Sequence, residues 1–137
     1  MKSGKQRRAE LKARRLMRAD SLRLLDPRGI GMAAALQPGM VLADRDKLAH
    51  NNTYGLLPFF YVDYAFTCRD CGSQEVWTAK QQKWWYEEAQ GHIDSRAVCC
   101  RPCRLIERAR VHEARRVAEE GLARKRALKA SKENNTP

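Results

Sequence analysis

Residues 97–104 read AVCCRPCR and hold three cysteines within five positions. The other two of the five cysteines lie upstream in the stretch FTCRDCG. Each stretch contains one C-x-x-C pair, Cys68 with Cys71 and Cys100 with Cys103. Two such pairs can close tetrahedrally around one ion, and this spacing is typical of a four-thiolate zinc site. We therefore predict one structural Zn²⁺ held by these four residues.

The fifth cysteine, Cys99, is the one we expect outside the metal site. Using it in place of Cys100 would turn a C-x-x-C pair into C-x-x-x-C. Four sulfur ligands fill the coordination sphere of zinc and leave no bound water to activate, so the site is predicted to be structural. A thioredoxin-like redox role would need a βαβ context, which the pattern lacks. The three histidines have no metal-ligand spacing to a cysteine pair: His50, His92 and His112.

The first cysteine pair is predicted to lie on a β-hairpin. The stretch FFYVDYAF, residues 59–66, alternates apolar and polar side chains and predicts one strand that runs into the first pair. Residues 75–77, EVW, predict the returning strand. One face of the first strand would consist of Phe60, Val62, Tyr64 and Phe66.

The second pair is predicted to lie at the start of a helix. Thr78 followed by Gln81 forms a capping box, which predicts a short helix that ends at Gly91. From Arg104 to about Lys132 the chain lacks proline and predicts a long basic helix. A zinc ribbon has both pairs on β-hairpins, whereas a treble clef has the second pair at a helix start. The pattern favours the treble clef.

These patterns predict a small α+β zinc domain over residues 54–104: a β-hairpin with one zinc knuckle, a short helix and a second knuckle. A basic helical arm, residues 1–28, and a basic helical tail, residues 105–137, flank it. Residues 29–53 are rich in Gly, Pro and Asn and predict a loop-rich linker. The helix expected over residues 5–25 has few apolar positions, so we expect it to be marginal alone and to need a partner.

The net charge of +11 is concentrated at the two ends of the chain. Residues 1–28 hold ten basic and three acidic side chains, and residues 104–137 hold ten and five. Residues 29–103 carry a net charge of −1. Basic flanks of this kind fit a polyanion, of which nucleic acid is the commonest, although charged faces can also serve solubility alone. The predicted phosphate contacts are Lys5, Arg7, Arg8, Arg14, Arg15, Arg18, Arg115, Arg116, Arg124, Lys125 and Arg126.

Three consecutive aromatic residues, Trp84, Trp85 and Tyr86, lie in the predicted short helix. Neighbours on a helix point about 100° apart, so the three rings cannot all be buried. We expect Trp77 and one of the two neighbouring tryptophans to pack over the zinc hairpin. The remaining rings could form an exposed platform for base stacking or protein docking. The plainer interpretation is that a small domain uses large rings for its core.

The segments YVDYAFTCRDCG, EVWTAKQQKWWYE and CRPCR resemble a family of bacterial zinc-ribbon proteins of the treble-clef-like type. The resemblance covers about residues 51–104, and the HNNTYG turn also resembles the family's upstream segment. It implies that the four paired cysteines are the zinc ligands. Cys99 stands where the family commonly has a basic residue. The family is mostly uncharacterised, so the resemblance implies the metal rather than a function.

The favoured function is a non-enzymatic, cytoplasmic zinc protein associated with nucleic acid, with RNA or the ribosome preferred over DNA. The alternative is a protein–protein adaptor, for example on the transcription machinery, that docks through the zinc domain and residues 84–86. The sequence lacks the features that would indicate an enzyme or a small-molecule substrate: an open metal position, a Gly-rich phosphate loop and a Ser/Cys–His arrangement. No apolar run reaches the ~20 residues of a membrane span, so no membrane partner is expected.

Overall fold

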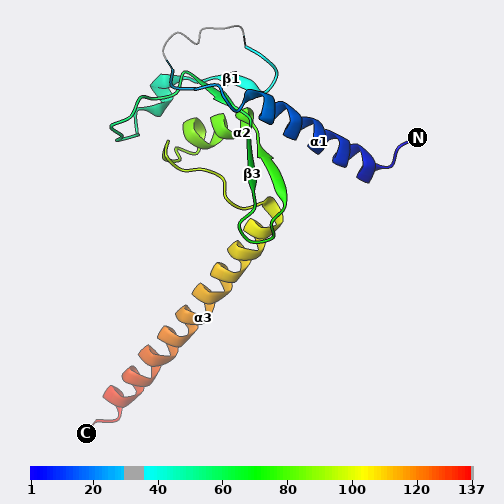
Figure 1. Cartoon of the computed structure of the whole chain (residues 1–137). Coiled ribbons are helices and arrows are strands. Elements are labelled where there is room, and N and C mark those ends of the chain that lie inside the picture. Colours follow the sequence, from blue (N-terminus) through cyan, green and yellow to red (C-terminus); the bar gives the residue numbers. More distant parts are fainter. Residues whose placement is uncertain (30–35, 137) are drawn as a thin grey trace. The chain divides into compact units, whose positions relative to one another are not determined.

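The structure is a computed structural model that describes residues 1–29 and 36–136. The chain divides into two compact units, residues 1–99 and 100–137. Of the elements in the described residues, eight belong to the first unit and one long helix belongs to the second (Figure 1). In chain order the elements are α1 (Gly4–Leu22), β1 (Met40–Leu42), the 3₁₀ turn η1 (Arg45–Leu48), β2 (Phe60–Val62), β3 (Tyr64–Thr67), β4 (Gln74–Trp77), α2 (Ala79–Lys83), the π-helical turn η2 (Trp84–Glu88) and α3 (Arg101–Asn134).

Two small antiparallel sheets form the β part of the first unit. Strand β1 pairs with β2, with Met40 opposite Val62. Strand β3 pairs with β4, with Tyr64 opposite Trp77. The predicted hairpin around the first cysteine pair is therefore confirmed, because that pair lies between β3 and β4. The returning strand is one residue longer at its start than the predicted one.

The prediction of one continuous strand over residues 59–66 is wrong, because the chain breaks at Asp63 into β2 and β3, which belong to different sheets. Asp63 is only 4% exposed, and its carboxylate accepts hydrogen bonds from the backbone N–H of Ala79 at 2.8 Å and from Arg18 Nη2 at 2.9 Å. Its own N–H donates to the carbonyl oxygen of Gly39 at 2.8 Å. A buried carboxylate needs such partners, and meeting them interrupts the ladder. The predicted apolar face is lost as well: Tyr64 is exposed, whereas Tyr61 is buried.

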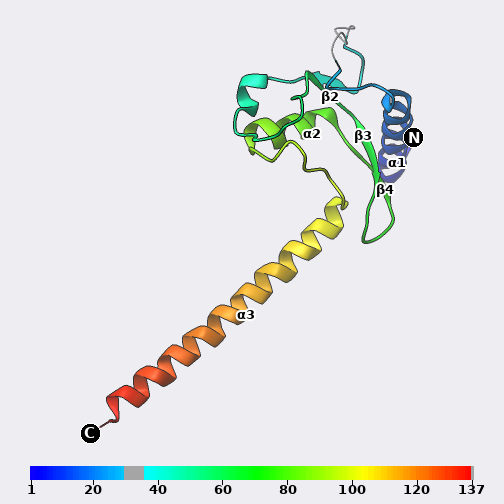
Figure 2. The same ribbon diagram turned by 60° about the vertical axis from the view of Figure 1, so that its left-hand side comes forward.

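Helix α1 lies against the β3–β4 pair within the first unit (Figure 2). It begins with a capping box, in which Ser3 Oγ accepts from the N–H of Gln6 and the Gln6 side chain accepts from the N–H of Ser3. Its last turns bury Ala19 and Leu22. The partner expected for this helix is supplied by the chain itself, because the β3–β4 pair and the Arg18–Asp63 ion pair hold it.

The short helix after β4 begins as predicted. Thr78 Oγ1 accepts from the N–H of Gln81, and the Gln81 side chain accepts in return from the N–H of Thr78. The predicted end at a left-handed Gly91 is wrong: η2 ends at Glu88, and the residue with positive φ, 56°, is Gln90. Gly91 has a different role, because a Cβ atom there would collide with the ring of Trp85.

The core of the first unit consists of two clusters of buried side chains. One contains Leu48, Tyr61, Ala79, Tyr86 and Ile93, and the other contains Leu22, Met40 and Phe60. Met40 on β1 and Leu48 on η1 lie within the stretch that we expected to be a loop-rich linker. This part of the chain thus supplies regular structure and core side chains, while residues 30–35 of the expected linker lie outside the described residues.

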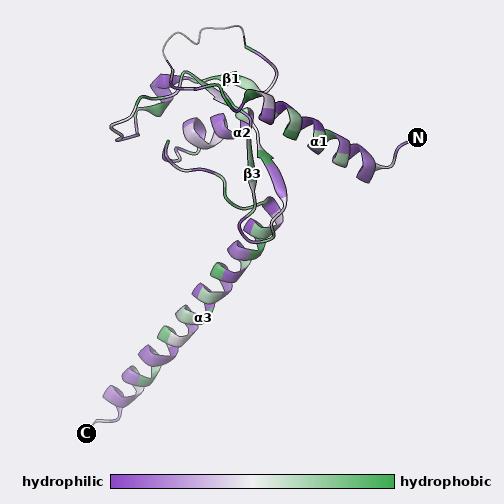
Figure 3. Cartoon of the chain, viewed as in Figure 1, coloured by the Kyte–Doolittle hydropathy of each residue, from purple (hydrophilic) through white to green (hydrophobic). Residues whose placement is uncertain are grey.

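The second unit begins with the second cysteine pair. Cys100 is the N-cap of α3, and Pro102 lies in its first turn, where a missing N–H costs nothing. The long basic helix predicted from Arg104 is confirmed and starts three residues earlier. None of its described side chains is buried, and Figure 3 shows hydrophilic stretches interrupted by short hydrophobic ones along it. Over residues 1–29 and 36–136, no helix has both the length and the hydropathy to cross a membrane.

We predict that Asp63→Ala lowers the free energy of unfolding of the zinc-loaded protein by about 2 kcal/mol, because the N–H of buried Ala79 loses its acceptor. Urea denaturation followed by circular dichroism measures this change. Asp20→Ala is the matched control. Asp20 is exposed on α1, and its Oδ1 atom lies 3.7 Å from Arg23 Nε. Removing such a surface ion pair should leave the free energy of unfolding close to that of the wild type. Equal midpoints for the two variants would contradict the central role of Asp63.

Candidate metal centre

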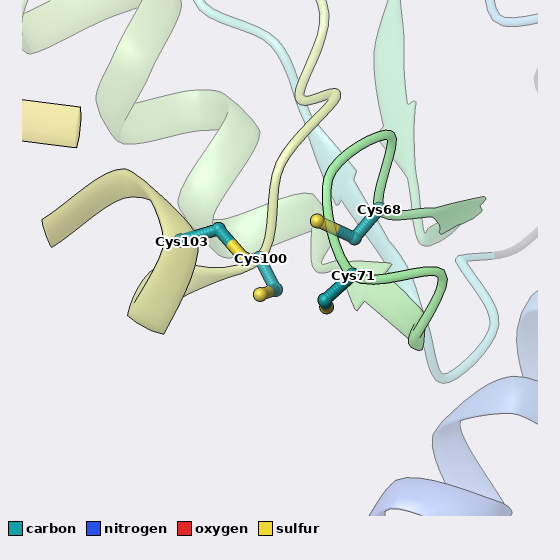
Figure 4. A group of neighbouring side chains, drawn as sticks. All are labelled: Cys68, Cys71, Cys100 and Cys103. Atoms are coloured by element: carbon teal, nitrogen blue, oxygen red, sulfur yellow. The ribbon is translucent and has the colours of Figure 1, made fainter. Parts of the chain in front are cut away.

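The structure brings together the four predicted metal ligands. Their sulfur atoms all lie within 4.8 Å of one another. Figure 4 shows two of these side chains on the loop after β3 and two at the beginning of α3. Cys68 and Cys100 are buried, Cys103 is half-buried and Cys71 is exposed. One knuckle on a hairpin and one at a helix start is the arrangement expected for a treble clef rather than for a zinc ribbon.

The first knuckle is a tight turn closed by backbone hydrogen bonds. The N–H of Cys68 donates to the carbonyl oxygen of Ser73 at 2.8 Å, and the N–H of Gly72 donates to that of Cys68 at 2.9 Å. Gly72 has a φ of 74°, and an added Cβ atom would meet no atom within 4 Å. Glycine is favoured here by the left-handed backbone and not by lack of space.

A line of polar side chains runs from this knuckle to α1. The Sγ atom of Cys71 lies 3.1 Å from Ser73 Oγ, which lies 3.1 Å from Glu75 Oε1. The same carboxylate oxygen accepts from Lys12 Nζ at 2.9 Å. In this arrangement the Cys71 thiol donates to Ser73 Oγ, and the Ser73 hydroxyl donates to the Glu75 carboxylate. A thiolate can only accept, so in the metal-bound form the single Ser73 proton can serve either the sulfur or the carboxylate. We did not single out these three neighbours from the sequence, although Ser73 and Glu75 directly follow the C-x-x-C-G turn.

The second knuckle uses the first turn of α3. Cys100 has extended backbone angles, φ −68° and ψ 164°, and its carbonyl oxygen accepts from the N–H of Arg104 at 3.0 Å. Cys103 lies three residues into the helix. The cap position and the third residue of the helix bring these two sulfurs within 4.8 Å of each other. Local helix geometry therefore prepares both sulfurs to act as metal ligands.

Cys99 is buried but does not belong to the group of four sulfurs. Its Sγ atom lies 3.4 Å from Asp70 Oδ2, to which the thiol donates. Burial, and next the hydrogen bond to Asp70, raise the pKa of the Cys99 thiol above its usual value. Next to it, the carbonyl oxygen of Val98 accepts from the N–H of Arg69 at 3.0 Å, which ties the two knuckle segments together beside the fifth cysteine.

The donor set fits zinc. With a Zn–S distance of about 2.3 Å, a tetrahedron of sulfurs has edges of about 3.8 Å, so sulfurs within 4.8 Å of one another need only small side-chain adjustments. Four thiolates around Zn²⁺ leave a net charge near −2, and arginines next to the ligands in sequence can offset it: Arg69, Arg101 and Arg104. Bound zinc would close the coordination sphere with sulfur and leave no position for substrate.

Residues 62–112 match the family model described as a probable treble clef domain. This segment is a treble clef zinc domain. The match begins before the first knuckle and extends into α3, so it includes all four ligands and confirms the treble-clef part of the resemblance noted from the sequence, whereas the HNNTYG turn lies outside the matched residues. No curated protein and no solved structure matches the chain.

The basic residues predicted to contact phosphates lie on the two long helices outside the treble clef hairpin. On α1 the exposed ones are Lys5, Arg7, Arg8, Arg14 and Arg15, and on α3 they are Arg115, Arg116, Arg124, Lys125 and Arg126. Arg18 differs from the rest because it is bound to buried Asp63. Arg116 pairs with Glu113 and Glu120 on its own helix. These two side chains are thus already engaged within the chain.

The aromatic block is divided between core and surface. Tyr86 is 6% exposed and packs against Trp77 and Tyr61, with ring centroids 5.5 and 5.7 Å apart, so it is not part of an exposed platform. Burial raises the pKa of Tyr86 to about 12, and its hydroxyl donates to the carbonyl oxygen of Ser95 at 2.6 Å. We expected Trp77 and at least one of Trp84 and Trp85 to pack over the zinc hairpin. Trp77 packs against the core cluster, whereas Trp84 and Trp85 are 60% and 38% exposed, and Tyr86 is the buried ring of the aromatic block.

We predict that Cys99→Ser retains one zinc per chain, whereas Cys100→Ser loses the metal, because only Cys100 belongs to the four-sulfur group. Zinc content of the purified proteins, measured by mass spectrometry of the metal, distinguishes the two variants. Cys68→Ser is the matched control for a buried ligand of the first knuckle. Equal zinc loss from Cys99→Ser and Cys100→Ser would show that the spare cysteine is wrongly assigned.

Proposed function

We propose that this protein is a non-enzymatic, cytoplasmic, nucleic-acid-associated zinc protein that binds RNA or the ribosome through its two basic helices. The treble clef domain supplies the metal-binding part of the chain. In this proposal the zinc ion is structural, and its contribution is to keep the two knuckles closed. The helices supply the contacts to the partner.

The observation that carries the proposal is the separation of charge along the chain. The middle of the chain, residues 29–103, is close to neutral, whereas the excess of positive charge lies at the two ends. In the described residues most of that excess is on exposed side chains of α1 and α3. A helix of 34 residues without a buried side chain also leaves its whole surface available to a partner. Solubility alone does not require such separation.

The chemistry proposed for these helices is contact with phosphate. Arginine and lysine side chains neutralise phosphates and release bound counterions, which gives affinity that falls steeply with salt. Such contacts carry no base information, so binding should be only weakly dependent on sequence. RNA is preferred to DNA because its single-stranded loops present unstacked bases that can stack on aromatic rings. The exposed Trp84 ring offers a surface on which an unpaired base can stack.

A structural zinc site supports a function without catalysis. Four sulfur ligands leave zinc no position for water or substrate, so the metal cannot act as a Lewis acid. The other buried charged groups of the first unit have structural partners: Asp63 binds Arg18, and Glu87 accepts from Lys83 Nζ at 2.8 Å. These side chains are used to hold the fold together.

A protein partner is the second candidate, and the two exposed tryptophans favour it. Trp84 and Trp85 lie side by side in the chain, and rings of this size are common anchors of protein interfaces. The Nε1 atom of Trp85 donates to Ser95 Oγ at 2.9 Å, which fixes the orientation of that ring. Capture of a protein that withstands nuclease and high salt, and that is lost in Trp84→Ala, would support this candidate over nucleic acid.

We predict that the full-length, zinc-loaded protein sediments with ribosomes in a lysate gradient at low salt and leaves them at high salt. The physical reason is counterion release on phosphate binding. Immunoblotting of gradient fractions with and without nuclease measures the association. Purified protein that shows no salt-sensitive binding to either RNA or DNA would end this proposal.

A further inference from the structure

The cations of α3 are unevenly distributed around the helix. At 100° per residue, five of them fall within an arc of about 60°. With a rise of 1.5 Å per residue, this face extends for about 38 Å along the helix. We call it the α3 basic face, and its members are Arg104, Arg108, Arg115, Arg126 and Lys129. Two of these residues belong to the contacts predicted from the sequence, and the other three do not.

The other side of α3 is occupied by ion pairs. Arg110 Nη2 lies 2.6 Å from Glu107 Oε1, and Arg116 Nη2 lies 2.6 Å from Glu113 Oε1. The Nη1 atom of Arg116 also lies 2.5 Å from Glu120 Oε1. These two arginines, together with Arg124, project more than about 90° away from the centre of the basic face.

Members of the basic face make no ion pair among the described residues. Two carboxylates, Glu119 and Glu133, fall at or near the same arc, which leaves the cations in two groups separated by a gap of about 16 Å between Arg115 and Arg126. The face is therefore net positive over two stretches. On the opposite side Arg110 and Arg116 are paired with glutamates, whereas Arg124 makes no ion pair among the described residues.

We propose that the α3 basic face binds one row of phosphates of an RNA strand, from outside the grooves and without reading bases. This inference rests on the proposed function and adds which residues form the contact. Charge complementarity supports RNA as the occupant, since unpaired cations attract phosphate while the paired side would bring glutamates close to it. A helix lying inside a duplex groove has phosphates on both flanks, so it would need cations on two sides. A row of cations that are not in ion pairs on one side suits a single backbone.

Two charge-matched double variants of the full-length, zinc-loaded protein test this assignment. The face variant is Arg108→Gln with Lys129→Gln. The control variant is Arg110→Gln with Lys132→Gln, which removes one arginine and one lysine from outside the face, neither of them among the contacts predicted from the sequence. Arg104 is left intact because it adjoins the ligand Cys103. Circular dichroism and zinc content verify that helix and metal are retained in each variant.

The probe is a labelled 20-nucleotide oligouridine, titrated by fluorescence anisotropy over a series of salt concentrations. Each phosphate contact on single strands contributes about 0.7 to the slope of log K against log salt. We expect the face variant to lose about 1.4 from this slope and about 10-fold in affinity at low salt. The control variant should keep the wild-type slope. The charge-conserving variant Arg108→Lys with Lys129→Arg should also keep the slope, because a phosphate contact needs the charge rather than the guanidinium shape.

Three other outcomes overturn the assignment and separate it from the proposed function. Equal losses in the face and control variants would mean that net charge alone matters, with the function intact. Wild-type behaviour of both variants would move the RNA contacts away from α3, again with the function intact. Absence of salt-sensitive binding by the wild-type protein would remove the proposed function and this inference together.

Discussion

The closing of four cysteine sulfurs around one zinc ion is the constraint on which the rest of this structure depends. Among the described residues only twelve apolar side chains are buried, and three of them are cysteines. A core of that size supplies little stability, and small domains commonly add a metal to compensate. Structural zinc contributes about 10–16 kcal/mol of apparent folding free energy in small zinc-finger peptides. The ligands also occupy the hairpin turn and the first turn of α3, so the metal controls local backbone geometry at both places.

The hydrogen bonds and the ion pair of buried Asp63 are a second constraint, which holds together elements of the first unit that contain no zinc ligand. Buried Asp63 joins three elements: it accepts from Arg18 on α1, caps the beginning of α2 through the N–H of Ala79, and separates β2 from β3. Gly39 lies against this group, and a Cβ atom there would come within 3.1 Å of the carboxylate. The cost of burying the charge is offset by these hydrogen bonds and by the guanidinium. The N-terminal helix is thereby part of the folded unit, and its outward basic side chains are presented from a fixed support.

Local signals in the sequence were sufficient for the metal site and for several element boundaries. The cysteine spacing identified the ligands, the Thr78–Gln81 capping box marked the start of α2, and the proline-free segment after Cys103 predicted α3. Features that depend on distant partners could not be predicted in this way. The break at Asp63 requires Arg18, 45 residues away, and the pairing of β1 with β2 joins a predicted linker to a predicted strand. The role of Gly91 depends on the ring of Trp85, which no periodicity reveals.

The fold depends most on the four atoms that bind the metal. Zinc K-edge X-ray absorption on the full-length protein identifies these atoms directly. With one zinc per chain, the spectrum should show four sulfur ligands at about 2.3 Å and no lighter ligand. Replacement of any sulfur by nitrogen or oxygen would contradict the four-cysteine site, as would a zinc content well below one per chain. Either result would also remove the argument that the metal has no open position for chemistry.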